Sequence, residues 1–221
     1  LKDFYKEDVS LDKWNLVYKL QQQKVEATIA DDVKNSAYKA IIFALIAIFL
    51  YILVRFRKWQ YGVGAVVSLF HNVLVLLGVF AIFHGIMPFP MEVGEAFIAA
   101  LLTVIGYSIN DTVVVFDRIR EFLRDRKEGD QSSVINAAIN STLSRTIITS
   151  FTTVLTMLVL FIAGPTDTMG FAFAIILGIL VGTYSSILIA TPIVVDLSKE
   201  EAQKNQVATP KKKGRSKVGN R

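Results

Sequence analysis

Residues 97–116 read FIAALLTVIGYSINDTVVVF, an apolar run that carries a single carboxylate, Asp111. A helix of ~20 mainly apolar residues is long enough to cross a lipid bilayer, so this run predicts a membrane-spanning helix. A carboxylate near the centre of such a helix costs on the order of 2.5–3.5 kcal/mol on insertion scales. Ionisable residues at that depth commonly mark ion or proton pathways, and the search for a function therefore begins at Asp111.

The rest of the chain repeats this apolar pattern. Hydrophobic residues make up 52% of the 221 residues, and the mean hydropathy is +0.47. These values predict an all-α, polytopic bundle of transmembrane helices. Five spans are expected within a transmembrane domain over residues 37–196, at about 37–56, 63–83, 97–116, 146–163 and 171–195.

Polar segments lie on both sides of this domain. Residues 1–36 are interpreted as the end of an extracytoplasmic α+β domain, because residues 24–30 alternate like a short strand, while residues 1–23 suit either a helix or a loop. No charged-then-apolar leader is present, which favours a fragment of a longer polypeptide. Residues 197–221 are expected to form a basic, unfolded tail, for which anionic membrane lipid is a nearer partner than nucleic acid.

The distribution of Lys and Arg predicts the orientation. Positive charge gathers at residues 55–58, 117–144 and beyond 195, whereas the connections 84–96 and 164–170 contain none. Cytoplasmic loops carry the positive excess in membrane proteins. The N-terminal segment is therefore expected outside and the C-terminal tail in the cytoplasm.

Asp111 has polar neighbours on its own helix. Tyr107 and Ser108 precede it by four and three residues and share its face, and Asn110 lies on the adjacent face. Desolvation would favour the neutral acid, whereas a nearby guanidinium would favour the carboxylate.

The next predicted helix carries a polar stripe that contains such a guanidinium, that of Arg145. Five residues of the next predicted helix follow spacings of 4, 4, 3 and 4 and so share one face: Ser141, Arg145, Thr149, Thr152 and Thr156. Arg145 could snorkel to the interface, form a fixed pair with Asp111, or move toward and away from it. In the last case the proton affinity of Asp111 would depend on how close Arg145 lies, and thus on the conformation of the helices. The hydroxyls could line a hydrated path or bond to other helices if this face looks into the bundle.

The last span carries a stripe of small residues. Every fourth position is small, at Gly170, Ala174, Gly178, Gly182 and Ser186. Small residues let transmembrane helices approach closely, so this stripe predicts a helix-packing surface.

No enzyme chemistry is indicated. The chain has no cysteine, its two histidines, His71 and His84, lack metal-ligand spacing, and neither a nucleophile elbow nor a Walker-type loop is present. We therefore expect no catalytic residues, no metal and no cofactor, with protons as the coupling ion.

Two motifs resemble a known family. Residues 106–121, GYSINDTVVVFDRIRE, and 140–146, NSTLSRT, resemble the SecF family, including the SecF half of fused SecDF proteins. The similarity continues through residues 29–37 and 49–57 and covers most of residues 25–195.

The resemblance implies a function and a set of partners. It implies a proton-motive-force-driven accessory of the Sec translocon in the bacterial inner membrane, related to the resistance-nodulation-division transporters. It also implies a SecD half or subunit, the SecYEG translocon, YajC and unfolded exported polypeptide as partners. Asp111 and Arg145 would lie on the proton path.

The sequence departs from the family pattern at two places. Residues 25–27 read VEA where Val-Gly-Pro is usual, and His71 is followed by Asn72 where His-Asp is common. His71 is better interpreted as packed or hydrogen-bonded than as a proton carrier. A small-molecule exporter and a structural scaffold remain alternative functions. Five spans alone would leave Asp111 and Arg145 incompletely partnered, which predicts assembly with a second, homologous set of helices.

Overall fold

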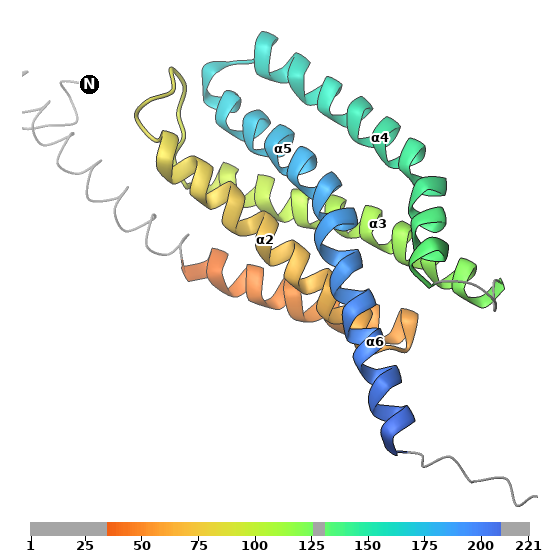
Figure 1. Cartoon of the computed structure of the whole chain (residues 1–221). Coiled ribbons are helices and arrows are strands. Elements are labelled where there is room, and N and C mark those ends of the chain that lie inside the picture. The colour runs from red at the N-terminus through yellow and green to blue at the C-terminus, as the bar shows by residue number, and fades with distance from the viewer. Residues whose placement is uncertain (1–34, 126–130, 209–221) are drawn as a thin grey trace, which may run out of the picture.

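The computed structural model describes residues 35–125 and 131–208, and these residues form a bundle of long helices (Figure 1). The first helix covers Asn35–Phe56. It is followed by α2 (Trp59–Phe83), α3 (Glu95–Asp125), α4 (Gln131–Ala163), α5 (Thr166–Ser185), the π-helix η2 (Ser186–Ala190) and α6 (Thr191–Ala208). No strand occurs in this part of the chain. The predicted all-α membrane bundle is confirmed, whereas the expected α+β remnant lies in residues 1–34, outside the described residues.

The helices extend beyond the predicted spans at several ends. α3 continues past residue 116 to Asp125, and α4 begins at Gln131 rather than near residue 146. The tail expected to be unfolded from residue 197 instead continues α6 to Ala208. Residues 197–208 are rich in Lys, Glu, Gln and Ala, which have high helix propensity, so the helix can leave the apolar region without ending. Residues 209–221 lie outside the described part.

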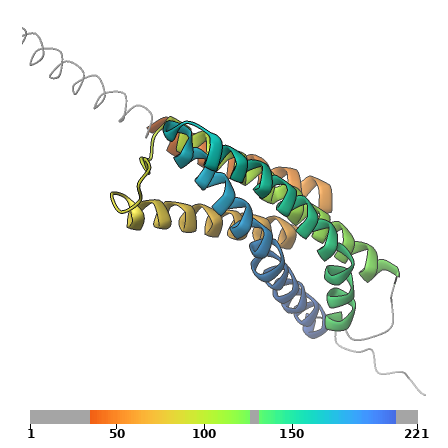
Figure 2. The same ribbon diagram turned by 90° about the horizontal axis from the view of Figure 1, so that it is seen from above.

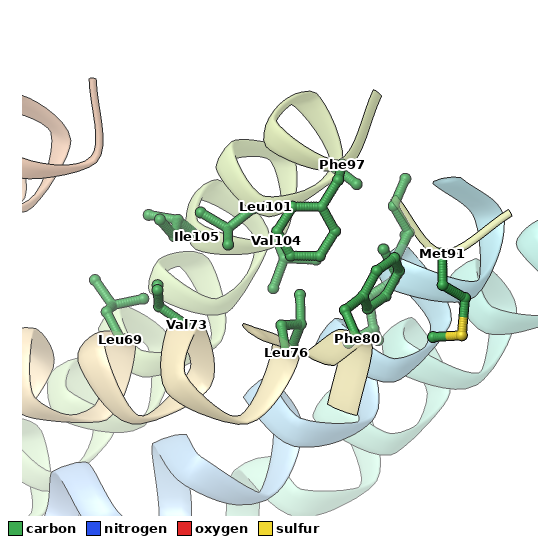
Figure 3. Close-up of a cluster of buried hydrophobic side chains, with 13 residues drawn as sticks. Leu69, Val73, Leu76, Phe80, Met91, Phe97, Leu101, Val104 and Ile105 are labelled. Carbon is green, nitrogen blue, oxygen red and sulfur yellow. The ribbon is translucent and has the colours of Figure 1, made fainter. Parts of the chain in front are cut away.

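The centre of the bundle is apolar and is built mainly from α2, α3 and α5. Figure 3 shows how side chains of α2 and α3 meet, with Met91 of the connecting segment closing one end. The buried positions repeat at spacings of three and four residues, which places them on one face of each helix: Leu69, Val73, Leu76 and Phe80 on α2, and Phe97, Leu101, Val104 and Ile105 on α3. This core fixes α3, and with it Asp111, against α2 and α5.

The first helix packs at one end of the bundle through its last turns. Ile52 and Phe56 join a buried cluster with Phe116 of α3, and Arg55 pairs with Asp117 at 2.6 Å. The helix then stops at Arg57, whose φ of 57° is left-handed and whose amide donates to the Leu53 carbonyl at 2.9 Å. The chain can thus turn directly into α2.

Large apolar side chains cover the outside of the molecule. All five long helices are apolar and long enough to cross a bilayer, and together they make this a multi-pass membrane protein. Burial differs sharply between them, since 6% of the most apolar window of the first helix is buried but 50% of that in Thr166–Glu200. α5 therefore lies inside the bundle, in contact with α2, α3 and α4 (Figure 2).

Candidate functional site

Asp111 lies midway along α3 and is almost completely buried. Its relative exposure is 5%, and its Oδ2 has no hydrogen-bond partner among the described residues. The neighbouring hydroxyl of Thr112 does not help, because it donates to the Ser108 carbonyl at 3.0 Å. A buried polar atom without a partner is costly. Asp111 therefore has a hydrogen-bonding requirement that this arrangement of helices does not meet.

Arg145 lies on α4, which packs against α3, but it does not bind Asp111. Its guanidinium makes no hydrogen bond or ion pair with the described residues, and it is exposed on α4. The alternative of a fixed Asp111–Arg145 pair is thus absent from this conformation. The two side chains belong to different helices, so a change in helix packing would alter their separation.

The polar stripe of α4 faces away from the bundle. Ser141, Arg145, Thr149, Thr152 and Thr156 are all exposed. The three threonines donate to carbonyls of their own helix at 2.9–3.0 Å. Another side of α4, with Thr142, Thr146 and Ser150, is buried instead. The part of the stripe from Arg145 to Thr156 is therefore available for contact with a partner outside this chain, and its threonine hydroxyl oxygens can still accept hydrogen bonds.

The other predicted supporting residues divide between the interior and the surface. Ser108 is buried, and the half-buried Tyr107 accepts a hydrogen bond from Thr153 at 3.4 Å. Asn110 is exposed, and Ser141 accepts a hydrogen bond from Arg118 Nε at 2.9 Å. The structure thus brings Tyr107 and Ser108 into the bundle beside Asp111. It leaves Asn110, Ser141 and Thr149 at its outer face.

The small residues of α5 and η2 lie where this helix meets its neighbours. Gly170, Ala174, Gly178, Gly182 and Ser186 are all buried. A Cβ added at Gly178 would collide with Val104 of α3, and one at Gly182 would meet Ser108 at 3.1 Å. The small side chains therefore allow α5 to lie directly against α3, next to the Asp111 turn.

A hydrogen-bond chain reaches Ser108 from two other helices; it begins at the exposed Tyr184 and ends at the buried Asn72 and Ser108. Asn72 of α2 is 1% exposed and donates from Nδ2 to Ser108 Oγ at 2.9 Å. His71 lies 3.5 Å from Asn72 Oδ1 through its Nδ1, and its Nε2 lies 3.2 Å from the Tyr184 hydroxyl of α5. His71 is thus hydrogen-bonded, as interpreted from the sequence. The role of Tyr184 was missed, although an amide within the apolar residues 63–83 was a signal that Asn72 needs partners.

Comparison with known proteins agrees with this architecture. Residues 8–200 match the family model described as protein export membrane protein SecD/SecF, C-terminal. The chain belongs to the SecD/SecF family. It corresponds to SecF or to the SecF half of SecDF, as the resemblance of residues 106–121 and 140–146 implied.

Individual relatives support the SecF assignment. The chain is 50% identical to the protein translocase subunit SecF of Rhodothermus marinus over 190 residues, which are 86% of this chain and 61% of that protein. It is 44% identical to the protein translocase subunit SecDF of Brucella abortus over 171 residues, 77% of this chain and 22% of that protein. The chain thus spans less than two thirds of these relatives.

A solved structure shows the same arrangement of helices. The crystal structure of SecDF in its super-membrane-facing form superposes with a TM-score of 0.72 at 36% sequence identity. The match covers 82% of this chain and 24% of that chain. The bundle described above is therefore a SecF-type bundle in which most of the longer SecDF chain has no counterpart.

Proposed function

We propose that this chain is part of a proton-motive-force-driven SecF or SecDF protein that promotes late steps of protein export across the bacterial cytoplasmic membrane. Asp111 is the proton site, and Arg145 is the charged group whose distance from Asp111 changes during the cycle. The observation that carries this proposal is the buried Asp111, whose Oδ2 has no partner among the described residues, while Arg145 stands on the adjoining helix α4.

The chemistry of this site suits energy coupling. When Arg145 is distant, the neutral, protonated form of Asp111 avoids an isolated buried charge. When Arg145 approaches, its guanidinium stabilises the carboxylate, and the proton can leave. A proton crossing the membrane supplies about 2.3 kcal/mol per 100 mV, enough to bias a two-state rearrangement of helices. Movement of α4 against α3 would thus be tied to proton uptake and release.

The exposed stripe of α4 supports a proposal for where the SecD half binds. Arg145, Thr149, Thr152 and Thr156 would face hydrocarbon if this bundle acted alone, which is unfavourable for the guanidinium in particular. A homologous set of helices covering the stripe would supply hydrogen-bond partners and a hydrated space between the halves. We propose that the SecD half or subunit covers this face, and that the assembled protein acts with the SecYEG translocon.

The charged ends of the helices support one orientation. Arg118, Arg120 and Arg124 lie at the end of α3, and Arg55 and Arg57 lie where the first helix stops. The salt bridge between Arg55 and Asp117 places these two ends side by side. This end of the bundle is therefore assigned to the cytoplasm, with the N-terminal segment outside.

The test is the proton-motive-force dependence of export in membrane vesicles that carry the full-length protein and its partners. Release of a late translocation intermediate would be compared for wild type and Asp111→Asn at matched abundance. The proposal predicts that Asp111→Asn loses the dependence while the protein still assembles. If export in Asp111→Asn still depends on the proton-motive force, the proton site must lie elsewhere in the complex.

Asp117→Asn is the matched control. Asp117 lies on the same helix but is partly exposed and already paired with Arg55. The same chemical change there should leave the proton-motive-force dependence intact. Equal losses in both variants would show that any carboxylate of α3 affects export, and would remove the special role of Asp111.

A further inference from the structure

The hydroxyl of Ser108 differs from most others in the bundle. Most Ser and Thr hydroxyls here donate to a backbone carbonyl of the preceding turn, as Ser68 does to Ala65 at 2.8 Å and Thr103 does to Ala99 at 2.8 Å. Ser108 makes no such donation within the described residues, although it is only 1% exposed. Its Oγ is instead occupied as an acceptor by the Asn72 amide. The hydroxyl hydrogen of Ser108 therefore remains available.

The direction of the hydrogen-bond chain follows from the orientation of Asn72. Because Nδ2 of Asn72 donates to Ser108, its Oδ1 faces His71 Nδ1 and can only accept. His71 must then carry its hydrogen on Nδ1, and Nε2 becomes the acceptor for the Tyr184 hydroxyl. Every step donates in the same direction, from Tyr184 through His71 and Asn72 to Ser108.

Asp111 follows Ser108, the last residue of this chain, by three residues, so the two side chains share a face of α3. In the present conformation Ser108 makes no hydrogen bond to Asp111 Oδ2. The chain ends in a free donor, and the buried Oδ2 of Asp111 needs one. Gly182 leaves the space for this arrangement, because a Cβ there would lie 3.1 Å from Ser108 Oγ and 3.7 Å from Asn72 Nδ2.

We infer that Ser108 is the hydrogen-bond donor to the ionised form of Asp111, and that Asn72, His71 and Tyr184 are positioning residues that keep its hydroxyl free for that task. This inference rests on the proposed function of Asp111. It adds a donor other than Arg145 that stabilises the carboxylate.

The competing role for these residues is simple adhesion between helices, because hydrogen bonds across transmembrane helices also stabilise their packing. The two roles differ in what they do to the carboxylate. Adhesion affects abundance and unfolding temperature. A donor to Asp111 also changes the infrared stretching bands of its carboxyl group and the rate of proton-driven export.

The experiment compares Ser108→Ala and Tyr184→Phe with wild type in the full-length protein. The Asp111 bands are identified as those lost in Asp111→Asn by infrared difference spectroscopy between high and low pH. Ser108→Ala should shift the carboxylate band and lower the rate of proton-motive-force-dependent export roughly tenfold, because a hydrogen bond to a charged group is lost. Tyr184→Phe keeps the ring against His71 and should produce a smaller shift in the same direction.

Ser68→Ala is the matched control, since Ser68 is a buried hydroxyl on α2 that donates only to its own helix. It should leave the Asp111 band and the export rate unchanged. If Ser108→Ala and Tyr184→Phe leave the band in place at matched abundance, the inference is overturned, even if both lower thermal stability. If Asp111→Asn itself leaves the proton dependence intact, the proposed function fails first.

Discussion

α4 and the last membrane helix, formed by α5 and its continuation, are almost equally apolar, yet they occupy opposite positions in the bundle. In the most apolar window of α4, 11% of the residues are buried, compared with 50% in Thr166–Glu200. Hydropathy therefore accounts for the presence of both helices in the membrane but not for their places within it. The difference lies in where the small and polar residues stand along each helix.

Packing in a bilayer explains this difference. Lipid tails are as apolar as Leu side chains, so helices associate through close contact and hydrogen bonds rather than through a hydrophobic driving force. Gly178 and Gly182 bring α5 against α3, and the close contact makes α5 central. α4 has its polar stripe on an exposed face, which we propose is covered by the SecD half.

The largest effect on stability is expected from placing a larger side chain at the contact between α5 and α3. Gly178→Val should destabilise the protein by about 1–3 kcal/mol, because the new side chain would collide with Val104 and force α5 away from α3. The measurement is thermal unfolding of the purified full-length protein in detergent. Gly78→Val is the control, since a Cβ at Gly78 would have no atom within 4 Å. Equal losses of stability in the two variants would show that helix propensity, rather than the contact between α5 and α3, determines the effect.

A smaller effect is expected from the hydrogen bond that joins α4 to α5. Ser150 of α4 and Thr183 of α5 share a hydrogen bond of 2.7 Å. Hydrogen bonds between transmembrane helices contribute about 0.6 kcal/mol on average and up to about 1.7 kcal/mol. A double-mutant cycle with Ser150→Ala and Thr183→Val should return a coupling energy in that range. Strictly additive losses would mean that this hydrogen bond does not hold α4 to α5.

The smallest effect on stability is expected at the exposed stripe. Thr152→Val should change the free energy of unfolding by less than about 0.5 kcal/mol, because its hydroxyl bonds only to carbonyls of its own helix. The same substitution should weaken association with the SecD partner, measured by co-purification. A large loss of stability in the isolated chain, with association unchanged, would contradict the assignment of this face to an interface.

The sequence allowed much of this to be predicted, and its limits have physical causes. Apolar length located the five helices, and the isolated carboxylate located Asp111. Periodicity showed that the threonines of α4 share a face, but it could not show whether that face turns inward or outward. The direction depends on the packing of Ser150 and Thr183, which lie 33 residues apart. The pairing of Asn72 with Ser108, 36 residues apart, is equally non-local.

Hydropathy alone also could not predict where the helices end. α3, α4 and α6 continue into polar sequence, where helix propensity rather than apolar length decides the boundary. The predicted spans therefore describe the membrane-crossing parts and not the full helices. The extension of α3 has a consequence for the site, because it carries Asp117 to its partner Arg55.

Site-specific photo-cross-linking tests most directly whether the polar stripe of α4 becomes an interior face when the two halves assemble. A benzophenone side chain would be placed at Thr152 or Phe151 in the full-length protein in membranes. A helix turns about 100° per residue, so these neighbours point to different sides, and Phe151 is 65% exposed. We predict cross-links to the SecD half from position 152 and few from position 151. Cross-links only to lipid from position 152 would contradict it.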